Sequence, residues 1–353
     1  MGVSVQPIID FFTSPTTIAY IVLIHVVFFA LQISAAVLVL AERKVAAFSQ
    51  QRLGPYRVGW WGILQPLADI LKLLMKEELR PKGADRWLFT LAPILSVTAA
   101  FAAFATVPWG AETTLFGLLD EPVKLGAADV NVGVLVVFAI TSMGVYGIVL
   151  AGWSSNSKYS LLGGLRSAAQ MISYELSYAT AIAAVILLAG SMSIREIVDG
   201  QAGSWFSIVP RWYVFLQPLG FIIYMIAGVA ETNRAPFDFP EAEQELVAGY
   251  NTEYSSVRFA LFPQAEYINM TTMAAVATGL YLGGWHGPFL PVEYGWIWFL
   301  VKVSAILFLY IWVRWTVPRY RYDQLMQFGW KWLFPAAVVN LILTAAAVLY
   351  FNA

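Results

Sequence analysis

The chain has 353 residues, of which 59% are apolar and only 12% are charged, and its formal net charge is −1. Soluble proteins carry about 25% charged residues, so a soluble fold is excluded, and the high apolar content excludes a disordered chain. Because the sequence contains no cysteine, disulfides, cysteine-bound zinc, iron–sulfur clusters and thiol catalysis are also excluded. The net charge gives no reason to expect nucleic acid as a partner. The composition indicates an integral membrane protein.

Eight apolar runs are long enough to cross a bilayer as helices, which takes about 20 residues each. Strands of a membrane barrel would alternate in polarity instead. The sequence therefore predicts an all-α integral membrane protein with eight transmembrane helices, organised as a single membrane domain over residues 1–353. The predicted spans cover residues 18–41, 87–108, 130–152, 174–190, 212–230, 267–285, 296–317 and 330–351.

The positive charges predict the orientation. Of the 21 lysines and arginines, 17 lie in or beside the loops 42–86, 153–173, 231–266 and 318–329. By the positive-inside rule these four loops are cytoplasmic, and both termini are then on the periplasmic side. No positive charge precedes Arg43, unlike a signal peptide or an Arg-rich transit peptide. We therefore expect a multi-pass protein of a bacterial plasma membrane.

The first inner loop contains an amphipathic helix in residues 61–79, after a Gly54-Pro55 turn. Its polar residues are spaced to lie on one stripe, and apolar residues cover the rest. Such a helix is expected to lie on the membrane or under a partner. The alternative is a simple interfacial anchor with solvated charges. The polar stripe consists of Gln65, Asp69, Lys72 and Lys76.

The third inner loop is rich in acids and is punctuated by Pro236 and Pro240. Prolines disfavour helix for the residues before them, so 233–239 is predicted to be extended or turned. Asp238 has the spacing of a capping box with the acid three residues later, which predicts a new helix. Crowded carboxylates in a partly dry place can hold protons near neutral pH, so the loop is a candidate proton relay; the alternative is a solvated acidic helix. The acids from the predicted helix onwards are Glu241, Glu243, Glu245, Glu253 and Glu266.

Isolated charges also fall at or within the spans. Glu42, Glu175 and Glu231 lie at the inner ends of spans one, four and five. Carboxylates at such positions are functional candidates by default, with a hydrated interfacial position as the alternative. Lys302 is expected to extend outward to water, and His25 is expected to be a packed core residue.

Three segments together resemble the NuoH-type membrane subunit of respiratory complex I, the proton-pumping NADH:quinone oxidoreductase. They are ERKVAAFSQQRLGPYRVGWWGILQPLADILKLLMKE (42–77), GWSSNSKYSLLGGLRSAAQMISYELS (152–177) and ETNRAPFDFPEAEQELVAGYNTEYSS (231–256). The resemblance extends over nearly the whole chain and agrees with eight spans.

The resemblance implies a place at the junction of the membrane arm and the hydrophilic arm. The inner loops and two peripheral subunits would enclose a quinone chamber, reached from the bilayer between the first span and the amphipathic helix. The substrate would be ubiquinone or menaquinone, while FMN and iron–sulfur clusters would be bound only by partner subunits. No catalytic residue, metal or covalently bound cofactor is implied for this chain. The implied chamber residues are Glu42, Arg43, Gln50, Arg52, Asp69, Lys72 and Arg234.

The resemblance also implies a row of acids that links the chamber to antiporter-like and small membrane subunits. Lipid and quinone would be the other partners. One alternative is a related subunit of a proton-pumping hydrogenase or ferredoxin-fed complex. Others are a stand-alone secondary transporter, for which no repeated halves are found, and a structural anchor with incidental acids. The implied proton path consists of Glu175, Glu231, Glu241, Glu243, Glu245, Glu253 and Glu266.

Overall fold

The computed structural model describes residues 14–114, 122–205, 209–239 and 247–352. Within these residues the regular secondary structure is helical, apart from two short antiparallel ribbons, β1–β2 and β3–β4. The all-α prediction is therefore confirmed. The helices are α2 (Pro15–Ser49), α3 (Gln65–Met75), α4 (Arg86–Ala105), α5 (Gly133–Ser154), α6 (Lys158–Ala189), α7 (Ile194–Asp199), α8 (Tyr213–Leu216), α9 (Pro218–Glu231), α11 (Ser256–Tyr281), α12 (Gly295–Thr316), α13 (Tyr322–Phe328) and α14 (Phe334–Asn352). The strands are β1 (Glu112–Thr113), β2 (Val123–Lys124), β3 (Ser204–Trp205) and β4 (Val209–Pro210), and the short turns of helix are η1 (Trp60–Gly62), η2 (Gly249–Asn251), η3 (Val292–Tyr294) and η4 (Gly329–Leu333).

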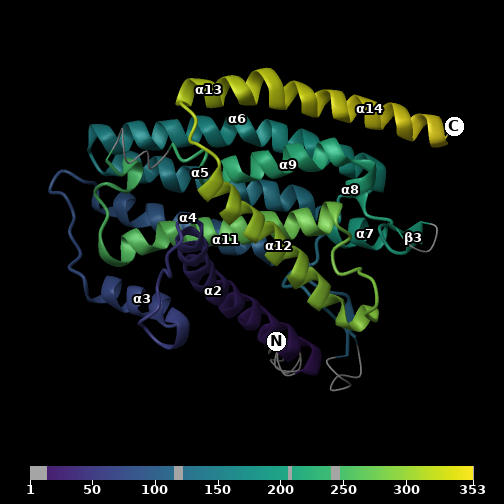
Figure 1. Ribbon diagram of the computed structural model, residues 1–353, viewed down its shortest axis with the longest axis horizontal. Coiled ribbons are helices and arrows are strands. Elements are labelled where there is room, and N and C mark those ends of the chain that lie inside the picture. The colour runs from purple at the N-terminus through teal and green to yellow at the C-terminus, as the bar shows by residue number, and fades with distance from the viewer. Residues whose placement is uncertain (1–13, 115–121, 206–208, 240–246, 353) are drawn as a thin grey trace, which may run out of the picture.

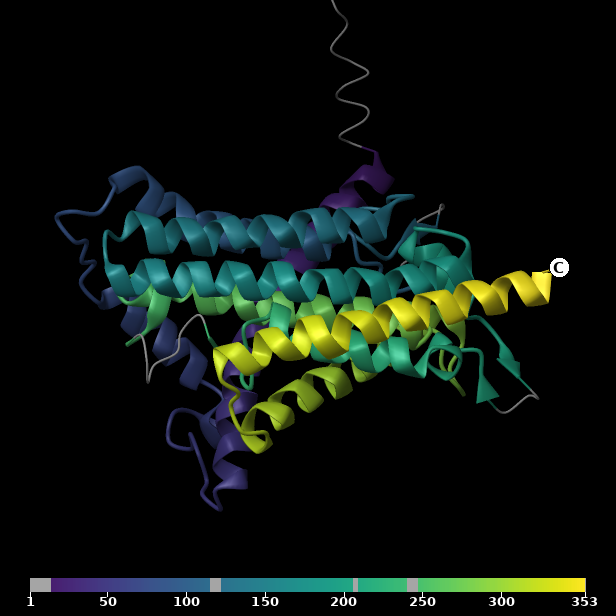
Figure 2. The same ribbon diagram turned by 90° about the horizontal axis from the view of Figure 1, so that it is seen from above.

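Helix α11 runs through the middle of the bundle and contacts α2, α4, α9 and α12 (Figure 1). Its residues from Tyr267 to Tyr281 are almost all buried. Helices α4, α5 and α6 follow one another as packed neighbours, and α14 lies along α6 (Figure 2). Helix α3 lies apart from these, at one end of the bundle, where it contacts α2 and α11. We call this the inner end, because the inner loops predicted from the charges lie there.

Within the described residues, six helical segments are long and apolar enough to cross a membrane. They coincide with six of the predicted spans: α2, α4, α5, α6, α12 and the continuous segment from α13 to α14. The other two predicted spans fall on α9, which has 14 residues, and α11, which has 26. Helix α11 carries polar residues such as Thr271, Thr272 and Thr278, all of them buried. Because its neighbours enclose it, α11 does not need an apolar surface.

The predicted span 212–230 is interrupted at Gln217, which separates α8 from α9. Pro218 is the first residue of α9, a position that suits proline, and proline disfavours helix for the residue before it. The Gln217 side chain is buried and bonds to α14: its Nε2 donates to Thr344 Oγ1 at 2.5 Å, and its Oε1 accepts from Asn340 Nδ2 at 2.7 Å. The two hydrogen bonds of Gln217 thus hold the start of α9 against α14.

The amphipathic helix of the first inner loop is shorter than the predicted 61–79. Trp61 and Gly62 have φ values of 55° and 79°, which ends any helix there, and a Cβ on Gly62 would clash with the Pro55 carbonyl. Helix α3 begins only at Gln65, with Pro66 in its first turn, and Lys76 is already extended. Residues 61–64 therefore belong to the tight turn before α3, although the apolar pattern had placed them in the helix.

The other inner loops also differ in detail from the prediction. Most of the segment 153–173 is helical, because α6 begins at Lys158 immediately after a short turn. Residues 233–239 form turns without regular helix, as predicted from the prolines. The helix predicted to carry Glu241, Glu243 and Glu245 lies outside the described residues.

His25 was predicted to be a packed core residue, and this prediction is wrong. It lies on the exposed face of α2, where its Nδ1 is 2.8 Å from the Ile21 carbonyl oxygen. Helix α2 lies at the edge of the bundle and buries a narrow stripe that includes Leu23, Val27 and Leu31. Position 25 falls between the members of this stripe, so the helix geometry directs it outward.

The prediction for Lys302 is also wrong. Its side chain does not extend to water: the residue is 7% exposed, and its Nζ donates to the carbonyls of Leu282, Gly284 and His286 at 2.6, 2.9 and 2.6 Å. The chain after α11 turns back over α12 and supplies these three oxygens. A buried ammonium group needs such partners, because an unpaired charge in an apolar interior is very costly.

Candidate functional site

An open groove of about 420 Å³ lies between α2, α3 and α11 at the inner end of the bundle. Its walls are mainly apolar, with Ala36 from α2, Leu73 and Leu74 from α3 and Phe259 from α11. A cleft of a few hundred Å³ with apolar walls and few polar groups suits a small apolar ligand. The polar side chains that line it are Gln32, Arg43, Asp69, Gln264 and Tyr267.

Two of the predicted chamber residues meet in this groove. Arg43 Nη1 donates to Asp69 Oδ2 at 2.5 Å, and Gln65 Nε2 donates to Asp69 Oδ1 at 3.2 Å. The Arg43 side chain is 45% exposed, so this ion pair contributes little net stability. It joins α3 to the inner part of α2 along one wall of the groove.

Glu42 lies behind the groove with three partners. It forms ion pairs with Arg314 and with Arg234, whose Nη1 is 3.5 Å from Glu42 Oε2, and Tyr267 OH donates to the same oxygen at 2.7 Å. The Glu42 side chain is only 9% exposed, so these contacts replace the water that a carboxylate would otherwise bind. Tyr267 also lines the groove. It therefore joins the groove to the buried charges.

Arg234 stands between two acids. Its Nη2 is 3.2 Å from Glu266 Oε2, and its guanidinium lies 4.1 Å from the centre of the Tyr267 ring. Tyr250 OH donates to Glu266 Oε1 at 3.1 Å. Among the described residues, this cluster with Glu42 and Arg314 holds two carboxylates and two guanidiniums. Opposite charges thus face one another in a partly dry place, which offsets part of the cost of burying them.

A polar cavity of about 20 Å³ follows on the far side of Glu266. It is lined by Glu231, Glu266, Asn233 and Asn269, among others, and it is large enough for a single water. Glu231 is 9% exposed, and within the described residues its Oε2 makes no hydrogen bond. The fold therefore brings the predicted acids Glu231 and Glu266 to one cavity although they lie on different helices.

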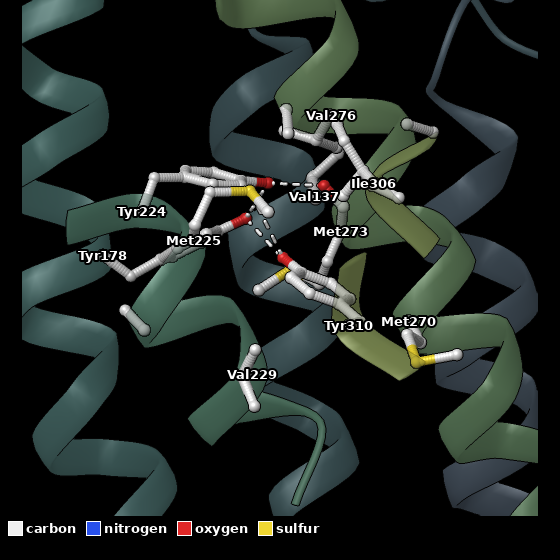
Figure 3. Packing of buried hydrophobic residues seen from close by; sticks show 14 of the residues in the cluster. Val137, Tyr178, Tyr224, Met225, Val229, Met270, Met273, Val276, Ile306 and Tyr310 are labelled. Atoms are coloured by element: carbon white, nitrogen blue, oxygen red, sulfur yellow. Dashed lines mark hydrogen bonds between the residues drawn. The ribbon is translucent and has the colours of Figure 1, made fainter. Parts of the chain in front are cut away.

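Glu175 accepts a hydrogen bond from Ser142 Oγ of α5. Three residues further along α6, Tyr178 OH lies 3.3 Å from Tyr224 OH, which in turn donates to the Met273 carbonyl at 2.8 Å (Figure 3). This pair of hydroxyls ends on a backbone oxygen, which has no proton to pass on.

The third loop is held to α4 by Tyr254. Its ring stacks on Phe89 with centroids 4.0 Å apart, and its hydroxyl donates to the Phe89 carbonyl at 3.1 Å. Burial raises the pKa of Tyr254 to about 12, so its hydroxyl remains a donor at neutral pH. Its neighbour Glu253, a predicted proton-path residue, is half-buried and does not line the cavity of Glu231.

Several other predicted site residues do not line the groove or the cavity of Glu231. Arg52 Nε donates to Gln50 Oε1 at 2.7 Å, and both lie exposed at the end of α2, outside the lining of the groove. Lys72 is exposed on α3 and does not line the groove either. Among the described residues, no three His, Asp or Glu side chains are grouped as a metal site would need. The acids at 241, 243 and 245 lie outside the described chain.

Several residues in these contacts were not predicted as site residues, among them Arg314, Tyr267 and Ser142. Arg314 follows the positive-inside pattern, so the sequence gives it an ordinary interfacial role. Tyr267 and Ser142 lie within helices and show no local motif. Only the packing of α5, α6, α11 and α12 reveals what they contact.

Comparisons with known proteins identify the family of this chain. A family model described as NADH dehydrogenase matches residues 21–345. The chain is 51% identical over 341 residues to a NADH-quinone oxidoreductase subunit of Geobacter metallireducens, covering 94% of this chain and 96% of that one. It is 48% identical over 338 residues to NADH-quinone oxidoreductase subunit 8 of Rhodothermus marinus, covering 92% and 95%. The resemblance found in the three sequence segments is thereby confirmed, and the chain belongs to the NuoH family of membrane subunits of NADH-quinone oxidoreductase (complex I).

Proposed function

We propose that this subunit provides the path by which quinone reaches its chamber and the first part of the path that couples quinone reduction to proton transfer. The observation that carries the proposal is the position of Tyr267. Its side chain lines the apolar groove, and its hydroxyl donates to Glu42 in the buried charge cluster. A change of charge or protonation in the groove is thus one hydrogen bond away from the acids.

The groove between α2, α3 and α11 would admit ubiquinone or menaquinone from the lipid. Its apolar walls suit an isoprenoid tail, and Arg43, Asp69 and Gln264 offer polar contacts to a quinone ring. Peripheral subunits would complete the chamber, with Glu42, Arg43, Gln50, Arg52, Asp69, Lys72 and Arg234 facing it. Electrons would come from FMN and iron–sulfur clusters in those partners, since this chain has no cysteine to bind a cluster.

The acids would then carry the effect of quinone reduction away from the chamber. Reduction to quinol consumes two protons and alters local charge, and Coulomb interactions are several-fold stronger in a partly dry site than in water. Glu42 and Glu266 are each paired with an arginine, whereas Glu231 has no cation beside it among the residues that the structure describes. A buried carboxylate without a counter-charge is costly to keep charged, which makes Glu231 the acid best suited to bind and release a proton. The remaining members of the proposed path are Glu175, Glu241, Glu243, Glu245 and Glu253.

We also propose that all eight predicted spans cross a bacterial plasma membrane, with both termini periplasmic. Helix α11 supports this, because its 26 residues extend through the whole bundle. Helix α9 is preceded by α8, and the two together cover most of the predicted fifth span. The antiporter-like and small membrane subunits of the complex would then receive the proton path from Glu175.

Replacing both Glu231 and Glu266 with Gln tests the coupling path. We expect proton pumping with quinone as acceptor to fall by about tenfold or more, since amides cannot relay protons as carboxylates do. NADH oxidation by a water-soluble artificial acceptor should remain normal, because electrons enter through partner subunits. Both rates are measured on the purified complex reconstituted in vesicles.

Glu293→Gln is the matched control, since Glu293 lies in η3 on the loop between α11 and α12. It should pump normally. Normal pumping by the double variant, in complex that is fully assembled, would exclude both acids from the path.

A further inference from the structure

Gln170 of α6 makes an unusual set of contacts with the loop that follows α9. The residue is 0% exposed, and its Nε2 donates to the carbonyls of Ala230 and Phe237, both at 2.8 Å. The same nitrogen lies 3.4 Å from Asn233 Oδ1. One amide group therefore touches the beginning, the middle and the end of a single short segment.

This segment, residues 230–237, is a loop that the amide of Gln170 holds closed. Within it, Asn233 has φ +52°, and Phe237 N donates to the Arg234 carbonyl at 2.9 Å. Arg234 lies between the two carbonyls that Gln170 binds. The Arg234 backbone is held by its own N–H, which donates to the Val229 carbonyl at 3.4 Å, and by the bridge that Gln170 makes from Ala230 to Phe237.

We propose that Gln170 is a positioning residue for Arg234. By holding the loop 230–237 closed, its amide keeps the Arg234 guanidinium between Glu42 and Glu266, at 3.5 and 3.2 Å. Gln170 contacts neither acid itself and acts only through the loop. This inference rests on the proposed coupling role of the charge cluster.

The chemistry of the side chain explains why glutamine is needed. A primary amide has two N–H donors on one nitrogen, which matches two carbonyls at 2.8 Å on different residues. Leucine has a similar size and no donor. Glutamate has one O–H donor when it is protonated and none when it is ionised.

Gln170→Leu in the complete complex is the first test, and Gln201→Leu is its matched control. Gln201 is equally buried, and its Nε2 also donates to backbone carbonyls, including those of Ile197 and Gly279 at 3.1 and 2.8 Å. It lies at the opposite end of α11 from the charge cluster. A loss of stability alone should therefore be common to both variants, while a loss of coupling should be confined to Gln170→Leu.

We expect Gln170→Leu to lower the number of protons pumped per electron and to reduce quinone-linked turnover by about tenfold per assembled complex, because the segment loses both buried hydrogen bonds to the Gln170 amide. NADH oxidation by a water-soluble artificial acceptor should not change. Gln201→Leu should give less assembled complex with normal coupling. Normal coupling in assembled Gln170→Leu complex would overturn the proposal.

Two further variants separate positioning from a general structural role. Gln170→Glu should regain turnover as the pH is lowered, because the protonated acid recovers one donor. Adding Gln170→Leu to Arg234→Met should cause no further loss of coupling, since both act through one guanidinium. Fully additive losses would refute action through Arg234. If Arg234→Met pumps protons normally, the proposed coupling role of the charge cluster is wrong. If Arg234→Met loses coupling but Gln170→Leu does not, only the inference about Gln170 is wrong.

Discussion

At the scale of single residues, Lys302 shows how a buried positive charge can close the end of a helix. The three carbonyls that it binds follow directly after α11, and its Nζ also lies 4.3 Å from the centre of the Trp212 ring. Burial lowers the pKa of the nearby His286 imidazole, although Asp199 opposes this, so His286 is neutral at neutral pH and adds no second positive charge. Lys302 thus fixes the end of α11 that is remote from the groove.

Lys302→Met should destabilise the subunit by about 2–4 kcal/mol, because it leaves buried carbonyls without a donor. Thermal unfolding of the purified complex, followed through loss of this subunit, measures the effect. The exposed Lys331 provides the control, and Lys331→Met should unfold at the original temperature. Equal stability of the two variants would mean that water reaches the three carbonyls.

At the scale of elements, α3 is held in place by polar contacts rather than by a core. None of its residues is buried. Besides the ion pair of Arg43 with Asp69, Ser256 Oγ at the start of α11 donates to the Leu73 carbonyl at 2.9 Å. Arg258 Nε lies 2.8 Å from Glu78 Oε1 just beyond α3. These contacts leave the apolar side chains of α3 to face the groove and the outside of the bundle.

The groove between α2, α3 and α11 gives a prediction about quinone access. Ala260 of α11 lines it, and Ala260→Trp should fill much of its width. We expect the KM for long-tailed quinones to rise by about tenfold, while kcat for a short-chain analogue changes little, because only the access path is narrowed. Steady-state kinetics with quinones of different tail length measures this.

Leu71→Trp is the control for that experiment. Leu71 lies on α3, is 51% exposed and does not line the groove, so this variant should keep the original KM for every quinone. If Ala260→Trp leaves the KM of long-tailed quinones unchanged, the tail does not pass between α2 and α11.

The positions of the helices could be predicted from the sequence better than their lengths and their burial. Apolar runs located every long helix, since lipid imposes one requirement along the whole span. The lengths of α3 and α9 could not be predicted from the apolar pattern, because Gly62 packs closely against the Pro55 carbonyl within its own loop and Gln217 bonds to α14, which is distant in the chain. The burial of α11 could not be predicted from its composition either, because an enclosed helix can carry polar residues without cost once their hydroxyls are hydrogen-bonded.

At the scale of the whole molecule, the candidate site was predictable only in part. Charges at span ends pointed to Glu42 and Glu231, and the family resemblance added Arg234; the structure places these three around one cluster and its adjoining cavity. The partners of Glu42 were not predictable, since Arg314 and Tyr267 come from helices far away from it in the chain. Which groups a buried charge contacts is decided by packing, and local patterns contain no information on it.

The arrangement of the whole chain across the membrane gives the last prediction. The natural sequence has no cysteine, so single cysteines can be introduced and labelled in this chain without background from its own thiols. Ala202 and Val292 precede α8 and α12 in the predicted outer loops, and Val247 lies between α9 and α11 in the predicted third inner loop. All three positions are exposed.

If α9 and α11 both cross the membrane, a membrane-impermeant maleimide should label Ala202→Cys and Val292→Cys in intact cells and should label Val247→Cys only in inverted vesicles. Lys82→Cys, in the first inner loop, should behave like Val247→Cys and confirms that the vesicles are sealed. The loop between α9 and α11 carries acids of the proposed path. The side of the membrane on which this loop lies is therefore the side from which protons reach Glu231. Labelling of positions 202 and 247 from the same side would show that the segment between them does not cross, and eight spans would then be wrong.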